Sequence, residues 1–226
     1  MRVGLLQLTS GDRPEVNLPI TLDMINQAAA QGAEVVITPE VTNCVSISRA
    51  HQMDVLRAEE DDQTLRAIRA LAKKQQIWVI LGSIAVKTSD PDGRFANRQF
   101  VINPAGDIAA RYDKMHMFDV SLSETESYRE SAGYRPGKDA VVASIAGVKV
   151  GLSICYDLRF PYLYRDLAQS GAKVLIVPSA FSVPTGAAHW EVLLRARAIE
   201  TGCFVLAPAQ TGDHKGRRTY GHSQSV

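Results

Sequence analysis

Apolar positions in the first third of the chain change period from segment to segment. Arg2–Leu8 and Glu34–Thr38 are short apolar runs, which predict strands, and the second reads as buried on both faces. Asn17–Gln31 and Asp62–Gln75 instead repeat apolar side chains every three or four residues, which predicts helices. We expect Pro19 in the first turn of the first helix, where a missing backbone N–H costs no hydrogen bond. The alternation of strand and helix indicates βαβ units.

Strands joined by turn residues dominate the middle of the chain. The segments predicted as strands here are Ile77–Val86, Ala96–Asn103, Ile108–Tyr112, Val141–Ile145 and Val148–Ile154. Between them, Lys114–Gly137 has no clear period and holds many polar and aromatic residues. A connection of that length is usually either functional or disordered, and both readings stay open for this segment.

Helical periodicity returns towards the C-terminus. Pro161–Gln169 and Ala187–Thr201 are predicted helices. The strands expected in this part are Lys173–Val177, Cys203–Ala207 and Thr219–Val226. Asp213–Arg218 is interpreted as a basic polar turn, with Arg217 and Arg218 solvated.

The order of these elements places βαβ units at both ends of the chain and antiparallel hairpins between them. Two sheets packed face to face, with helices outside, satisfy this order. We therefore expect an α/β protein with a single domain over residues 1–226. On its last helix, Arg195 and Arg197 are placed on the polar side, where pairing with Glu191 or Glu200 is expected to be weak.

Composition and charge indicate which partners and which cellular compartment to expect. Hydrophobic residues make up 46% of the 226 residues and charged residues 22%, which indicates a sizeable core under an ordinary soluble surface. The formal net charge of +1 gives no electrostatic reason to expect nucleic acid or an anionic membrane as a partner. The chain has no apolar run long enough for a membrane span, and its first residues show no signal-peptide cleavage site. We expect a cytoplasmic protein.

The three cysteines, Cys44, Cys155 and Cys203, are widely spaced, and none forms a Cys-x-x-Cys pair. This argues against both a disulfide framework and a zinc site, so we expect free thiols and no metal. We interpret Cys44 as structural and Cys203 as part of the core.

Cys155 stands where an apolar strand ends and charged residues begin. A buried, inert thiol is one reading of this position, because free cysteine usually behaves as a small hydrophobe. The other reading is a nucleophile. Glu40 also follows a strand, and Lys114 opens the long middle segment that contains Glu130. In α/β sheets such segments gather at one edge, although a lone Glu or Lys is most often a cap or a solvated charge.

These residue types together would support acyl transfer. A carboxylate such as Glu40 can remove the proton of a thiol, give it to a leaving amine and then activate water. The ammonium of Lys114 and the backbone N–H of Tyr156 would stabilise the oxyanion of a tetrahedral intermediate. The lysine would also stabilise a thiolate, and both a low-pKa thiol and a buried inert thiol stay open for Cys155. The position of His116, two residues after Lys114, suggests a supporting hydrogen-bond role.

Several blocks of the sequence resemble the nitrilase (carbon–nitrogen hydrolase) superfamily, with Glu, Lys and Cys in the family order. The blocks are GLLQL, GAEVVITPE, Tyr112–His116, Phe118–Val120, Glu130–Gly137 and Cys155–Pro161. The resemblance covers essentially the whole chain. Within the superfamily the chain is similar to the Nit branch, and its SAFSVPTGAAHW…YGHS tail is most similar to the deaminated glutathione amidases.

This resemblance implies a four-layer αββα sandwich, a homodimer, and neither a metal nor an organic cofactor. It implies that Cys155 is the nucleophile, Glu40 the general base and Lys114 the oxyanion-stabilising residue, with Glu130 orienting the lysine or the base. It makes Arg159 a candidate for binding a substrate carboxylate. The weaker candidates for the pocket are Phe181 and Thr185.

The expected function is therefore that of a thiol amidase. It hydrolyses the terminal carboxamide of a small substrate that bears a carboxylate, by resemblance deaminated glutathione, through a cysteine thioester with release of ammonia. An ω-amidase acting on α-ketoglutaramate or α-ketosuccinamate is the nearest alternative. Hydrolysis of N-carbamoyl amides is more distant, and nitrile hydrolysis is disfavoured. A non-catalytic scaffold or binding protein on the same fold is the alternative of another class.

Two departures from the family pattern bear on these expectations. Family members usually continue past the GHS block with further strands and a tail, whereas this chain stops at Val226. Residues 119–128 also lack the glycine-containing loop that is common in eukaryotic relatives. That loop borders the pocket in the family, so the substrate follows less directly from the resemblance than the chemistry does.

Overall fold

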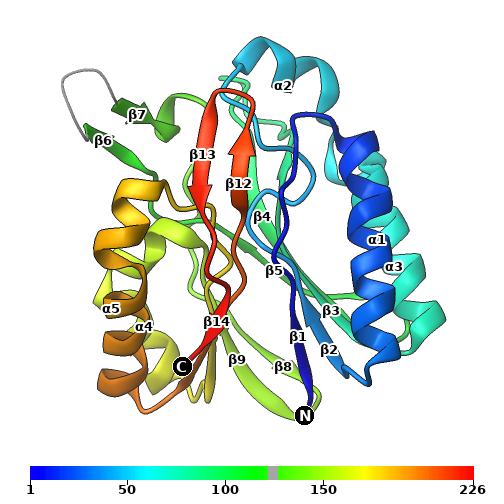
Figure 1. The fold of residues 1–226 in the computed structure, drawn as a ribbon, viewed down its shortest axis with the longest axis vertical. Coiled ribbons are helices and arrows are strands. Elements are labelled where there is room, and N and C mark those ends of the chain that lie inside the picture. Colours follow the sequence, from blue (N-terminus) through cyan, green and yellow to red (C-terminus); the bar gives the residue numbers. More distant parts are fainter. Residues whose placement is uncertain (122–126) are drawn as a thin grey trace.

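The computed structural model describes residues 1–121 and 127–226, and its elements form four layers, helix–sheet–sheet–helix (Figure 1). One five-stranded sheet has the order β1-β2-β3-β4-β5, and the other has the order β14-β11-β10-β9-β8. Helices α1 and α3 cover the outside of the first sheet, and α4 and α5 cover the outside of the second. The αββα sandwich expected from the resemblance is confirmed.

The first sheet runs parallel from β1 to β3 and antiparallel from β3 to β5. Its strands are β1 (Val3–Leu5), β2 (Val35–Ile37), β3 (Trp78–Val86), β4 (Ala96–Ile102) and β5 (Ile108–Asp113). The helices that accompany it are α1 (Pro14–Ala30), α2 (Arg49–Val55), α3 (Gln63–Gln75) and the 3-10 turn η1 (Glu59–Asp61).

The second sheet is parallel at its centre and antiparallel at both edges. Its strands are β8 (Val142–Ile145), β9 (Val148–Leu152), β10 (Val174–Ile176), β11 (Phe204–Ala207) and β14 (Gln224–Ser225). Its helices are η3 (Cys155–Arg159), α4 (Pro161–Gln169) and α5 (Val183–Thr201). The remaining elements are the ladders β6 (Asp119–Ser121) with β7 (Ser127–Arg129) and β12 (Thr211–His214) with β13 (Arg217–Tyr220), and the turn η2 (Glu130–Ala132).

Strand β2 shows why a continuous apolar run predicts a central strand. Val35 and Ile37 are buried in the cluster between the two sheets, whereas Val36 is buried in the cluster under α1 and α3. Successive side chains of a strand point to opposite faces, so a strand covered on both sides needs an apolar residue at every position. Each fully buried valine or isoleucine contributes about 1.5–3 kcal/mol.

The predicted start of the first helix is wrong. Helix α1 begins at Pro14, so Pro19 lies inside the helix rather than in its first turn. The added residues 14–16 are half-buried or exposed, so apolar periodicity does not mark them, and the first buried residue of the helix, Asn17, is polar. Asn17 accepts a hydrogen bond from Gly11 N–H at 2.7 Å and donates to the carbonyl oxygens of Gly11 and Asn43, both at 2.9 Å. Helix α5 likewise starts before its predicted first residue, with a proline in its first turn.

The segment expected to be a turn, Asp213–Arg218, contains the turn of the β12–β13 hairpin at residues 215–216, and its other residues belong to the two strands. Two predictions near the C-terminus are wrong. The expected final strand divides into β13 and β14. Arg197 is only 5% exposed instead of lying on a polar face. Its Nε and Nη2 donate to Leu158 O at 3.1 and 2.8 Å, which satisfies a carbonyl of η3. Its expected ion pair with Glu200 is present at 2.7 Å.

The long middle segment is partly ordered by the short β6–β7 ladder and by η2. The stretch that departs from the family pattern, residues 119–128, lies in part outside the described residues. In the part of the chain that the structure describes, no helix is long and apolar enough to span a membrane.

Candidate active site

The four residues predicted to carry the chemistry line a single cavity of about 650 Å³. Glu40 and Lys114 follow strands of the first sheet, whereas Cys155 follows β9 of the second. Glu130 comes from the long middle segment. The cavity also contains three other predicted residues, namely Tyr156, Phe181 and Thr185. The sandwich therefore brings together side chains that are up to 115 positions apart in sequence (40 and 155).

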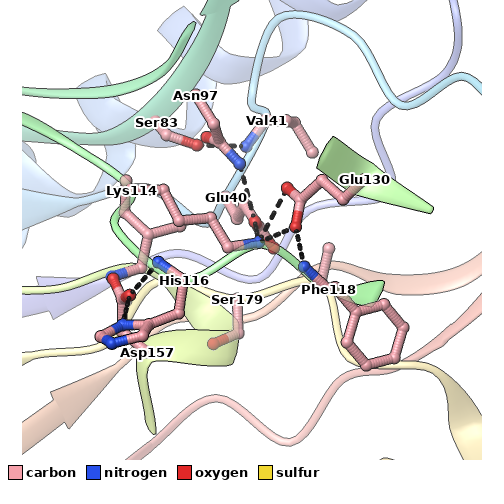
Figure 2. A network of polar contacts seen from close by, with 12 residues as sticks. Glu40, Val41, Ser83, Asn97, Lys114, His116, Phe118, Glu130, Asp157 and Ser179 are labelled. Atoms are coloured by element: carbon pink, nitrogen blue, oxygen red, sulfur yellow. Dashed lines mark hydrogen bonds and ion pairs between the residues drawn. The ribbon is translucent and has the colours of Figure 1, made fainter. Parts of the chain in front are cut away.

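Glu40 is held by the turn that follows β2. The backbone N–H of Val41 donates to the hydroxyl oxygen of Ser83 at 2.8 Å, and the Nδ2 of Asn97 donates to Glu40 Oε1 at 2.9 Å (Figure 2). This turn also lies directly against β3, because a Cβ on Gly82 would lie 1.9 Å from Thr38 O. The carboxylate of Glu40 is consequently 4% exposed and fixed in direction.

Lys114 directly follows β5 and points its ammonium between two carboxylates. Its Nζ lies 3.0 Å from Glu40 Oε1 and 2.8 Å from Glu130 Oε2 (Figure 2). Burial alone would lower the pKa of the lysine, but the two glutamates outweigh it and raise the pKa well above its usual value. Burial likewise opposes ionisation of Glu40, yet the nearby lysine charge brings the pKa of Glu40 below its usual value. At neutral pH the pair is an ammonium and a carboxylate.

Glu130 is anchored from its other side. Its Oε2 accepts a hydrogen bond from the backbone N–H of Phe118 at 2.6 Å. Both of its carboxylate oxygens also lie within 2.9 Å of Lys114 Nζ. Glu130 thus connects the middle segment to the lysine. This geometry is consistent with the role that the resemblance implies for Glu130, which is to orient Lys114 or Glu40.

Cys155 occupies a strained position at the start of η3. Its φ of +49° is in the left-handed region, which residues with a Cβ rarely adopt. Its backbone N–H donates to Pro178 O at 2.9 Å, and its thiol is hydrogen-bonded by the backbone of Ala180. Burial and the negative charge of Glu40 raise the pKa of the Cys155 thiol, and Lys114 offsets only part of this. The resting group is therefore a neutral thiol beside a carboxylate.

The backbone N–H of Tyr156 has no acceptor among the described residues, as expected for the first turn of a helix. Tyr156 also lines the cavity next to the nucleophile. A free N–H at this place can donate to an oxyanion that forms on the substrate.

Asp157 fixes the loop of the nucleophile to the strand that carries the lysine. Its fully buried carboxylate accepts hydrogen bonds from Tyr112 Oη at 2.7 Å and from the backbone N–H of Ile154 at 2.8 Å. It also accepts from the backbone N–H of His116 at 3.0 Å and lies 2.7 Å from His116 Nδ1. The predicted supporting hydrogen bond of His116 is confirmed.

The three predicted pocket residues differ in their positions. Phe181 and Thr185 line the cavity, but Arg159 does not. The guanidinium of Arg159 lies 5.9 Å from the ring centroids of both Tyr156 and Phe181, and its Nη2 lies 3.0 Å from His189 Nδ1. Arg159 therefore sits behind two rings of the cavity wall.

Two residues at the site escaped the sequence analysis. Asn97 donates to Glu40, and Arg217 lines the cavity from β13. The only signal for Arg217 was strand alternation, since Arg217 and the buried Thr219 lie on one face and the exposed Arg218 on the other. Reading the segment as a turn hid this alternation.

The other cysteines behave as predicted. Cys44 and Cys203 are buried free thiols, and burial together with Asp12 raises the pKa of Cys44 to about 12. Within the described ranges, no group of three or more His, Cys, Asp or Glu side chains is placed to hold a metal ion.

Comparisons with known proteins agree with this geometry. The model of the carbon-nitrogen hydrolase family matches residues 2–226. Deaminated glutathione amidase of Yersinia enterocolitica is 39% identical over 99% of this chain and 78% of its own length, and that of Dictyostelium discoideum is 41% identical over 100% and 79%. The crystal structure of the Caenorhabditis elegans NitFhit protein superposes with a TM-score of 0.92 at 36% identity. That match covers 99% of this chain and 55% of the NitFhit chain.

Proposed function

Since this chain belongs to the carbon–nitrogen hydrolase family, we propose that it hydrolyses a small carboxylate-bearing amide through a thioester on Cys155, with deaminated glutathione as the substrate. The enzyme class, an amidase acting on linear carbon–nitrogen bonds, follows from the family and from the amidases that the chain resembles. The observation that carries the mechanism is the buried Lys114 ammonium between Glu40 and Glu130, in the cavity that Cys155 lines.

In the first half-reaction, Glu40 accepts the thiol proton as Cys155 Sγ attacks the amide carbon. The carbonyl oxygen becomes an oxyanion near Lys114 and the free N–H of Tyr156. Glu40 then gives the proton to the amide nitrogen, the carbon–nitrogen bond breaks, and the amine leaves. The product is a thioester between Cys155 and the acyl group.

In the second half-reaction, Glu40 removes a proton from water, and the hydroxide adds to the thioester carbon. The same oxyanion contacts stabilise the second tetrahedral intermediate. Collapse of this intermediate breaks the carbon–sulfur bond, and Glu40 returns its proton to the sulfur. The lowered pKa of Glu40 and the raised pKa of Cys155 leave an ionised carboxylate and a protonated thiol at rest, which are the states from which the first transfer starts.

The leaving group separates the two substrate classes. In deaminated glutathione the amide nitrogen belongs to a cysteinylglycine unit, so hydrolysis releases that dipeptide. Ammonia is released only from a primary carboxamide such as α-ketoglutaramate. The expectation of ammonia release therefore fits the ω-amidase alternative, and an assay for the proposed substrate has to detect the dipeptide.

Arg159 is proposed to attract a substrate carboxylate from behind the cavity wall, with Phe181 and Thr185 in the wall. Its charge remains close to the site, since its guanidinium lies 5.9 Å from the ring centroids of Tyr156 and Phe181. A guanidinium can form two parallel hydrogen bonds to a carboxylate. Exchange of Arg159 for glutamine should raise KM for anionic amides more than it lowers kcat.

We also propose that the protein is a homodimer and that it is cytoplasmic. Four large apolar side chains are exposed on α4, α5 and β11, namely Tyr162, Val192, Ile199 and Phe204. Exposed apolar patches commonly mark protein interfaces, and this surface is a suitable place for a second copy. Light scattering of the purified chain would show twice its mass of 24.6 kDa if the dimer forms.

The experiment for the substrate compares kcat/KM on deaminated glutathione and α-ketoglutaramate, with the leaving group of each, cysteinylglycine or ammonia, quantified. A higher value for deaminated glutathione supports the proposal. A higher value for α-ketoglutaramate supports the ω-amidase alternative. Absence of turnover on every amide of a panel would contradict both amidase activities and support the alternative of a non-catalytic scaffold or binding protein.

A further inference from the structure

Arg217 differs from the other basic side chains of the cavity. Four basic residues line it, namely Arg49, Lys114, Arg129 and Arg217. The guanidinium of Arg49 donates to the carbonyls of Gly93 and Gly133 and lies 3.9 Å from the ring centroid of Phe95. Lys114 is paired with two glutamates. Among the described residues, Arg49, Arg129 and Arg217 have no ion pair with a carboxylate, and of these three only Arg217 has a buried guanidinium nitrogen without a hydrogen-bond partner.

The fold fastens Arg217 next to the nucleophile. Strand β13 is bridged to the loop before α5, because Tyr220 N–H donates to Phe181 O at 2.9 Å and Thr219 pairs with Ser182. The Nη2 of Arg217 donates to the carbonyl of Ala180. The backbone of that same residue also hydrogen-bonds the thiol of Cys155. A single residue therefore separates the guanidinium from the reacting sulfur.

Most of the donors of this guanidinium are unused. The Nε of Arg217 is buried and has no hydrogen-bond partner in the described part of the chain. A buried donor without an acceptor is unfavourable by about 1–3 kcal/mol, and more when it is charged. The residue itself is half-buried and lines the cavity, so an acceptor that enters the cavity can meet its guanidinium.

The charge of the cavity points to what that acceptor is. Glu40, Glu130 and Lys114 together leave one uncompensated negative charge at the nucleophile. A substrate that carries its own carboxylate would be repelled there unless another cation faced it. Arg217 is that cation, and its planar fork matches the two oxygens of a carboxylate.

We propose that Arg217 is a carboxylate-binding residue of this active site and selects anionic amides over neutral ones of the same shape. The proposal rests on the proposed function, whose substrate carries two carboxylates, one in the α-keto acid and one in the glycine. Arg217 inside the cavity and Arg159 behind its wall supply two guanidinium groups for them. The β12–β13 hairpin is then a specificity element.

Arg217 acts on the chemistry as well. Its positive charge is one of the influences that lower the pKa of Glu40, after the stronger effect of Lys114. Replacement of Arg217 by a neutral residue therefore also moves the acidic limb of the pH profile towards higher pH.

The test measures binding of glutarate, a five-carbon dicarboxylate, by titration calorimetry at pH 7.5. The proteins are the unaltered chain, Arg217→Gln, Arg217→Lys and the control Arg218→Gln. Arg218 is the neighbour of Arg217, but it is exposed and pairs with Asp213 at 3.4 Å. Glutamine retains a donor for Ala180 O, and circular dichroism checks that each variant is folded. Because binding needs no turnover, this experiment is independent of whether the amide is hydrolysed.

We expect Arg217→Gln to weaken glutarate binding by about 10- to 100-fold, the loss typical of a hydrogen bond to a charged group. Arg217→Lys should retain part of the affinity, and Arg218→Gln should retain all of it. Equal affinity in folded Arg217→Gln and in the unaltered chain would overturn the proposal, as would failure of the unaltered chain to bind glutarate. Failure of the proposed function would instead appear as absence of amide turnover, whatever the glutarate result.

Discussion

The carboxylate of Asp157 lies 2.7 Å from Nδ1 of His116, and this contact joins the two loops of the active site. Asp157 stands two residues after the nucleophile, and His116 stands two residues after the lysine. The His116 ring is also stacked on Phe160, with the centroids 3.6 Å apart. The relative position of Cys155 and Lys114 is therefore set by a buried polar contact rather than by the sheets alone.

The change Asp157→Asn tests this connection. Asparagine has nearly the same shape, but its NH₂ group cannot accept, so at least one of the four donors around Asp157 would face another donor. We expect the free energy of unfolding to fall by about 1–3 kcal/mol, together with a lower kcat. Urea unfolding and steady-state kinetics give the two numbers. The exposed Asp213→Asn variant is the control, and a loss of equal size there would contradict the account.

Glu40→Gln keeps the size of the side chain and removes its function as a base. We expect kcat/KM to fall by about 100- to 10,000-fold, the usual contribution of general acid–base catalysis. The thermal unfolding temperature should change little in comparison. A variant that keeps more than about a tenth of the activity would show that another group takes the proton.

The pH profile follows from the two shifted groups. Lys114 holds the pKa of Glu40 below 4.5, although burial opposes this, and burial raises the pKa of Cys155 above 9.0. Activity needs an ionised Glu40 and a thiol that keeps its proton until attack. We therefore expect kcat/KM to stay flat from about pH 6 to 9. A change in kcat/KM centred near pH 6.5 would instead indicate that a histidine titrates.

Gly82 is required by the turn that carries Glu40. A Cβ at this position would lie 1.9 Å from Thr38 O and 2.7 Å from Pro39 O, both backbone atoms that cannot move away cheaply. We expect Gly82→Ala to lower the free energy of unfolding by at least about 3 kcal/mol, the upper range for overpacking. Gly11→Ala is the matched control, because the atom nearest to its Cβ is 3.7 Å away. Chemical denaturation of both variants makes the comparison.

His214 makes stability depend on pH. Its Nδ1 lies 2.6 Å from Ser10 O and its Nε2 lies 2.7 Å from Thr219 Oγ1, and its burial lowers its pKa below 6.5. The unfolded chain then binds a proton more readily than the folded one. The stabilisation is complete above about pH 6.5 and is lost as pH falls through the lower folded value. His214→Gln should flatten the dependence of the unfolding temperature between about pH 7.5 and 5.5, and the exposed His189→Gln should not.

Much of the fold and the four central site residues could be predicted from the sequence. Periodicity located the sheets because a strand such as β2, covered on both faces, needs uninterrupted apolar residues. Glu40, Lys114 and Cys155 were identified mainly by family resemblance, since each residue alone can also be explained as a helix cap, a solvated charge or a buried inert thiol. Asn97 and Arg217 were missed because their roles depend on contacts between segments that are far apart in sequence. The pKa of the Cys155 thiol could not be predicted either, because burial cannot be read from residue type.

The central claim is that Cys155 forms the bond to the substrate. The most direct measurement is turnover of deaminated glutathione by Cys155→Ala and by the unaltered chain, with α-ketoglutarate and cysteinylglycine quantified by mass spectrometry. Alanine fits the space of the thiol, so the variant should fold with an unchanged far-ultraviolet circular dichroism spectrum. The account predicts both products from the unaltered chain and none from Cys155→Ala. Retention of turnover in the folded Cys155→Ala variant would contradict it.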